Sequence, residues 1–173
     1  VPLKEWIGAG AVADISDLVG DYELYSPEMI MSKVEVRKGD ILLINTGYHK
    51  YAWDQKYSDE VRYFVKHPGP DASFHKWALK MKLKWIGVDC GSADHPMNTI
   101  IRNWHPKAFI EAEKVLKAKT GKTWDEYFPQ DTYYQVMHLK LFPAGLVHAE
   151  NVGGEIGELG SQRLWIGCYP LKG

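Results

Sequence analysis

Residues 40–45 read DILLIN, from Asp40 to Asn45, and this short run decides the fold class. The four residues from Ile41 to Ile44 are all apolar, so both faces of an extended strand would be apolar. Such a strand is typical of the middle of a sheet that is covered on both faces. Polar side chains begin at Asn45 and Thr46, which places them at the carboxyl end of the strand.

Similar β-type runs alternate with longer helical segments along the rest of the chain. We predict strands at residues 11–15, 41–46, 84–89, 146–150 and 164–169. We also predict four helices. The first begins at Pro27 after a Ser26 cap, and the second carries the apolar stripe from Phe74 to Met81. The third runs from His105 to Gly121, and the fourth covers residues 133–141. This alternation is typical of an α/β layer fold with a mostly buried sheet.

Composition narrows the class of protein further. The 173 residues suit a single domain, and no apolar run approaches the ~20 residues of a membrane helix. The 21 Lys plus Arg residues nearly balance the 22 Asp plus Glu residues, which leaves no basic field for phosphates. We therefore expect no nucleic-acid and no membrane partner. Cys90 and Cys168 form no C-x-x-C pair, and a reducing, cytoplasmic location fits best.

Polar residues past two strand ends are candidates for binding a small molecule. Asn45, Thr46, Tyr48 and His49 follow the first of these strands, where α/β folds place their ligands, and we assign them to substrate binding. His95 follows the next strand end, where a polar turn network is favoured over contact with a substrate.

The C-terminal third holds a candidate metal site. His148 and Glu150 lie two residues apart on a predicted strand, so their side chains share one face, and His138 lies on the helix before it. An imidazole and a carboxylate from adjacent elements suit a divalent metal. Two ligands are fewer than the three that a catalytic zinc generally takes from the protein, so a salt-bridged core histidine is the simpler interpretation of the spacing.

Four motifs follow in order along nearly the whole chain. They are GDILLINTG at 39–47, HPG at 67–69, GVDCGSAD at 87–94, and His138 followed by Glu150-Asn151. Together they resemble the cyclase-like metal-dependent hydrolases of the kynurenine formamidase and isatin hydrolase type. The resemblance implies a layered β/β/α domain of the swivelling type with a mixed sheet, and hydrolysis of an amide, lactone or cyclic amide carbonyl with zinc or manganese. Its substrate would be a small amide or ester, and the assembly a homodimer or homotetramer.

The resemblance also assigns metal ligands. His138 and Glu150 match two of the ligands of that family, with the carboxylate bridging where two metals bind. Members of the family carry an H-x-G-T-H-x-D-x-P-x-H stretch farther upstream, which supplies the other ligands and the catalytic histidine. No such stretch occurs in residues 1–173, so the catalytic residue is unknown.

Three explanations for the missing stretch compete: a chain without its N-terminal part, a partner subunit that supplies the motif, or a homologue that has lost catalysis. We favour the first, and describe residues 1–173 as one domain that is incomplete at its N-terminus relative to the family. On this interpretation the isolated chain binds metal weakly and is nearly inactive. The alternative of a different class is a catalytically silent oligomeric scaffold. In either case we expect self-association, with Trp53 and Trp104 as candidate contact residues.

Overall fold

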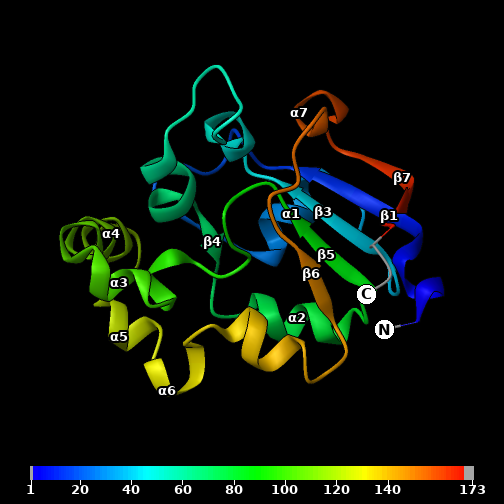
Figure 1. Ribbon diagram of the computed structural model, residues 1–173. Coiled ribbons are helices and arrows are strands. Elements are labelled where there is room, and N and C mark those ends of the chain that lie inside the picture. Colours follow the sequence, from blue (N-terminus) through cyan, green and yellow to red (C-terminus); the bar gives the residue numbers. More distant parts are fainter. Residues whose placement is uncertain (1, 170–173) are drawn as a thin grey trace.

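Five strands form one mixed sheet in the computed structural model, which describes residues 2–169 (Figure 1). The order is β6-β5-β3-β1-β7, and every neighbouring pair is parallel except β1 and β7. The strands are β1 (Ile7–Asp14), β3 (Ile41–Asn45), β5 (Trp85–Val88), β6 (Val147–Ala149) and β7 (Gln162–Gly167). All five predicted strands are present, and the expected α/β class with a mixed sheet is confirmed.

The central position of β3 is confirmed by its burial. Leu42 and Ile44 point into one core cluster, which α1 (Pro27–Lys33), α2 (Phe74–Lys80) and η5 (Met137–Leu141) complete. Ile41 points to the opposite face, where it joins a smaller cluster with Trp85 and Ile166. The predicted Ser26 cap of α1 is also present, since its hydroxyl accepts a hydrogen bond from the Met29 amide at 3.3 Å.

A second, two-stranded sheet was not predicted from the sequence. It pairs β2 (Leu24–Tyr25) with β4 (Gly69–Pro70) in parallel. Strands of two residues carry too little periodicity to detect. Gly69 is needed there, because a Cβ at this position would lie 2.4 Å from the Cβ of His95.

Helices and short turns make up the part of the molecule beside the sheet. They are α3 (Ile101–Trp104), α4 (Pro106–Thr120), α5 (Trp124–Tyr127) and α6 (Gln130–Tyr133), with short turns at η1 (Leu3–Trp6), η2 (Tyr48–Tyr51), η3 (Arg62–Lys66) and η4 (Pro96–Asn98), and α7 (Ile156–Leu159) near β7. Trp124 and Phe128 fill the centre of this part, and α4 ends as predicted at Gly121, whose φ is 74°. Among residues 2–169 no helix combines the length and apolarity needed to cross a bilayer.

The helix predicted over residues 133–141 is wrong in its first half. The chain leaves α6 at Tyr134, passes through Gln135 at a φ of 45°, and re-enters a single π-helical turn, η5. Tertiary hydrogen bonds replace the helical ones here: the Gln135 amide donates to the Asn98 carbonyl, and the Met137 amide donates to the Asp94 carboxylate. The break therefore ties η5 to the loop that follows β5.

Candidate metal centre

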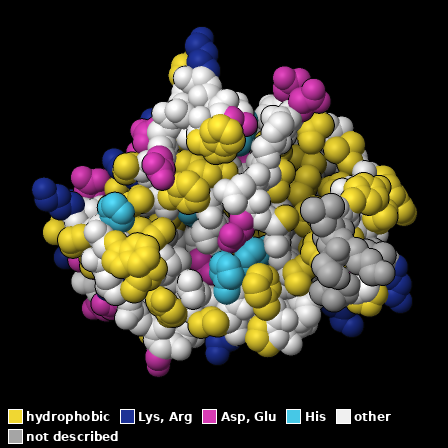
Figure 2. Space-filling model, viewed as in Figure 1, with side chains coloured by type: hydrophobic (Ala, Val, Ile, Leu, Met, Phe, Trp, Pro, Cys, Tyr) yellow, Lys and Arg dark blue, Asp and Glu magenta, His cyan; other side chains and the backbone are white. Residues whose placement is uncertain are grey.

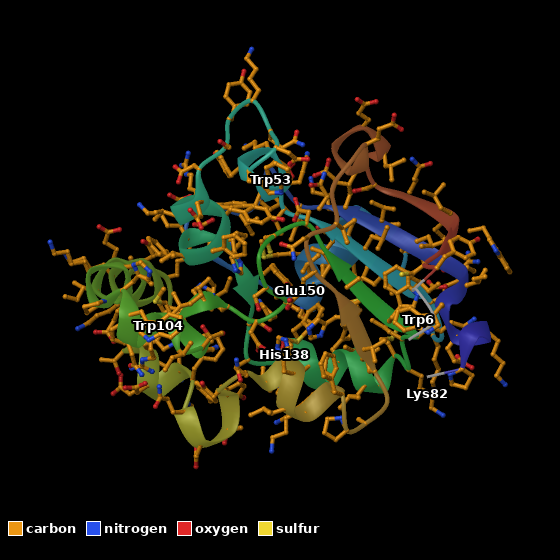
Figure 3. All side chains as sticks on the ribbon, in the orientation of Figure 1. Trp6, Trp53, Lys82, Trp104, His138 and Glu150 are labelled. Atoms are coloured by element: carbon orange, nitrogen blue, oxygen red, sulfur yellow. The ribbon has the colours of Figure 1, made fainter. Side chains whose placement is uncertain are left out.

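Three donor atoms from η5 and the β6 segment converge at one point of the surface. The Nε2 atoms of His138 and His148 are 3.3 Å apart, and Glu150 Oε1 lies 3.6 Å from the former and 3.2 Å from the latter. His138 and Glu150 lie close together, as expected from the helix–turn–strand sequence. Figure 3 shows both near the centre of the view, and Figure 2 shows histidine and acidic side chains gathered on the same part of this face.

The separations in this cluster fit one bound ion. Three donors that each lie about 2.0–2.2 Å from a metal at tetrahedral angles are about 3.3–3.6 Å apart. Two imidazole nitrogens and one carboxylate oxygen form a donor set suited to zinc or another transition metal, whereas magnesium and calcium prefer oxygen ligands. The side chains of His138 and Glu150 are 31% and 25% exposed, so a small molecule can reach the cluster.

A buried carboxylate fixes the orientation of His138. Asp94 Oδ2 lies 2.7 Å from His138 Nδ1, and Asp94 Oδ1 accepts the Met137 amide at 2.9 Å. Because an ionised carboxylate only accepts hydrogen bonds, Nδ1 carries the proton and the lone pair of Nε2 points into the cluster. The same hydrogen bond raises the pKa of His138, against a smaller lowering by burial. Asp94 was not identified from the sequence as part of the site.

Glu150 is held in its ionised form by its neighbours. Its Oε1 accepts hydrogen bonds from the Ala93 amide at 2.7 Å and from the Ser92 hydroxyl at 3.2 Å. Burial works to raise the pKa of Glu150, but these contacts and the two neighbouring histidines outweigh it and lower the pKa to about 2. The loop after β5 thus supports both His138 and Glu150, through Asp94 and through Ala93.

Three of the four residues assigned to substrate binding have their polar atoms engaged within the protein. Asn45 caps the following turn, and Thr46 donates to Asp89 through its amide and its hydroxyl. The Tyr48 hydroxyl donates to Asp21 at 2.5 Å, and the side chain is buried. Their contact with a substrate stays a prediction.

His49, the fourth, lines a cavity of about 380 Å³. Its Nδ1 lies 3.1 Å from Oδ2 of Asp89, a fully buried carboxylate. The cavity extends to Asn151, which directly follows Glu150 and accepts a hydrogen bond from the Tyr63 hydroxyl at 3.0 Å. Aromatic side chains form much of its wall, namely Trp53, Tyr63 and Phe64.

The structure also places two further histidines. His95 is buried, with Nε2 3.1 Å from the Tyr22 carbonyl and Nδ1 accepting the Met97 amide, so the polar turn network favoured from the sequence is present. His75, on α2, is likewise buried, and its ring packs edge-on against Tyr133.

The sequence and the fold both have known relatives. A family model described as "Putative cyclase" matches residues 1–95. These residues are more than half of the chain, and all of them precede the three-donor cluster. No curated protein matches the sequence.

Solved structures with a similar fold include the following two. Isatin hydrolase A from Labrenzia aggregata, bound to benzyl benzoate, superposes with a TM-score of 0.61 at 13% identity, over 99% of this chain and 58% of that one. A potential metal-dependent hydrolase with cyclase activity gives a TM-score of 0.50 at 14% identity, over 95% of this chain and 57% of that one. This chain therefore spans less than two thirds of the length of either structure, and at these identities the likeness shows the fold alone.

Proposed function

Because this chain belongs to the cyclase family, we propose that it is part of a metal-dependent hydrolase that cleaves an amide, lactone or cyclic amide carbonyl. The observation that carries the proposal is the pairing of His138 with Glu150, each held in a ligand-ready state by the loop after β5. Zinc or manganese suits these nitrogen and oxygen donors. The substrate we propose is a small amide or ester.

The residues of this chain would prepare the site for that reaction. A divalent ion held there would polarise a carbonyl oxygen and lower the pKa of a water molecule to about 7. Asp94 keeps the Nε2 lone pair of His138 available, and the low pKa of Glu150 keeps its carboxylate charged at neutral pH. The cavity that His49 and the aromatic side chains line reaches Asn151, the residue after Glu150, and offers room for the rest of the substrate.

His49 is the candidate substrate contact that the structure supports best. Asp89 accepts a hydrogen bond from its Nδ1, which leaves Nε2 as an acceptor for an N–H or O–H group of the substrate. Replacement of His49 by Gln should raise the KM and leave the bound metal unchanged, which kinetics and metal analysis of the same preparation can separate.

The resemblance places the catalytic histidine in a stretch that residues 1–173 do not contain. We therefore propose that this chain alone turns over slowly even with metal bound, and that the upstream segment restores the rate. This separates metal binding from turnover, and each can be measured by itself.

The test is hydrolysis of formyl-anilide, lactone and cyclic-imide substrates, with and without added Zn²⁺ or Mn²⁺, by this chain and by a protein extended with the upstream segment. In the extended protein, Glu150→Gln and His138→Gln should each abolish metal-dependent hydrolysis, whereas His105→Gln, at an exposed position, should not. Hydrolysis that is independent of metal, or absent from the extended protein, would contradict the proposed function.

We also propose that the protein is a cytoplasmic homo-oligomer. Trp53 and Trp104 are 91% and 71% exposed, far more than large aromatic side chains usually are, and Cys90 and Cys168 are free thiols. The same exposed residues favour the alternative of a silent scaffold, which the hydrolysis test above distinguishes from an enzyme.

A further inference from the structure

We propose that His148 is a third metal ligand, so that this chain holds one divalent ion with its own His138, His148 and Glu150. The inference rests on the proposed function and adds a ligand to it, because the family resemblance assigns only His138 and Glu150. It changes one expectation drawn from the sequence: weak metal binding followed from a count of two ligands, and the structure brings three donors together.

The position of His148 Nε2 supports this assignment. A histidine that only forms a salt bridge needs one contact, but this nitrogen lies within 3.3 Å of both other donor atoms. Since Asp94 holds the proton of His138 on Nδ1, Nε2 of His138 carries no proton and presents its lone pair to His148. The three separations are nearly equal, as they are around a single small ion.

The His148 side chain is fixed before any ion binds. It lies on β6, where His148 pairs with Ile86 of β5, and its ring stacks on Phe142 at 4.6 Å with an interplanar angle of 30°. Only 3% of the side chain is exposed. A ligand that is already held in place loses little conformational entropy when it binds the ion.

The cluster also has an open side. The open side of the cluster, where His138 and Glu150 are partly exposed, leaves a position for water or substrate.

Zinc titration of the purified chain at neutral pH, followed by calorimetry, tests the inference without any assay of activity. We expect one Zn²⁺ per chain. Replacement of His148 by Gln should weaken binding at least about 100-fold, as His138→Gln should, because each removes one of three ligands. His105→Gln removes an exposed imidazole and should leave the affinity unchanged.

Nuclear magnetic resonance of the histidine ring nitrogens gives a second readout on the unaltered chain. Without metal, His148 Nε2–H donates to Glu150, which leaves Nδ1 without a proton. Zinc at Nε2 moves the proton to Nδ1, so the tautomer of His148 should switch on saturation while that of His138 stays the same. This measurement decides the question if the His148→Gln protein does not fold.

The inference would be overturned by a zinc affinity that is unchanged by His148→Gln in a folded protein, or by a His148 tautomer that is unchanged at saturating zinc. Absence of zinc binding by the unaltered chain would overturn it as well. None of these results bears on metal-dependent hydrolysis by the extended protein, so the inference and the proposed function can fail separately.

Discussion

At the level of single residues, Asp94 orients one of the three donors of the cluster, His138. Its carboxylate accepts hydrogen bonds from the ring of His138 and from the Met137 amide, so it sets both the tautomer of the ligand and the start of η5. Partners of this kind typically change metal affinity by about 10- to 100-fold.

We therefore expect Asp94→Asn to weaken zinc binding by about 10- to 100-fold, because an amide no longer requires the proton on His138 Nδ1. Calorimetric titration measures the loss, and Asp131→Asn, at an exposed position, is the matched control. An Asp94→Asn protein that binds zinc as tightly as the unaltered chain would show that Asp94 does not orient His138.

Two other buried histidines make stability depend on pH. Burial lowers the pKa of His67 to about 4 and that of His95 to about 3, from 6.5 in the unfolded chain. The unfolded chain therefore binds more protons below pH 6.5, and stability is full above that pH and falls as the pH drops toward 4. Burial also lowers the pKa of His75, which acts in the same direction, whereas His138, whose pKa is raised, acts in the opposite direction.

Between pH 7 and pH 5 the free energy of unfolding should fall by about 2 kcal/mol for each of His67 and His95, less the opposing effect of His138. Urea unfolding of the metal-free chain at the two pH values measures it. A free energy of unfolding that is equal at pH 7 and pH 5 would show that these histidines are not held neutral by burial.

Among the helices and strands, α7 packs closely against His49, the candidate substrate contact. A Cβ at Gly157 would lie 2.8 Å from Nε2 and 3.0 Å from Cε1 of His49, so only glycine fits this approach. Gly153, in the same loop, has no atom nearer than 4.0 Å to such a Cβ.

Gly157→Ala should therefore displace the His49 ring or α7, and the ring resonances of His49 should shift. Gly153→Ala should leave them unchanged, and the zinc affinity of both variants should stay that of the unaltered chain. Identical His49 spectra in the two variants would place α7 farther from the ring than the structure does.

The elements also show what a sequence can and cannot predict. The apolar run at β3 and the capping residues of α1 and α4 are local signals, and these elements form where they were predicted. The break at Gln135 depends on hydrogen bonds to Asn98 and Asp94, which are distant in the chain, so a helical pattern could not reveal it.

In the candidate metal centre, too, local features could be predicted from the sequence and contacts between distant residues could not. The spacing of His148 and Glu150 on one strand was readable, and so was their nearness to His138. The sequence could not show that the His148 ring turns toward both donors, because the packing of Phe142 and the pairing of β6 with β5 decide it.

For the whole molecule, the exposed aromatic residues point to association between chains. Trp53 and Trp104 lie on different parts of the molecule. In Figure 3, Trp53 lies above Glu150, and Trp104 lies on the helical part. Light scattering at micromolar concentration should give a dimer or a tetramer, and Trp104→Ser should shift it toward monomer because it removes apolar contact area. A monomer for the unaltered chain would contradict this prediction.

We expect this chain to carry a metal site that is built on His138 and Glu150 and completed by His148. X-ray absorption spectroscopy of the chain loaded with one equivalent of Zn²⁺ tests it most directly, because the spectrum counts imidazole ligands. We expect two imidazole nitrogens and a carboxylate oxygen at about 2.0–2.2 Å from the zinc, with one imidazole lost in His148→Gln. A shell of oxygen atoms alone, or a sulfur ligand, would contradict it.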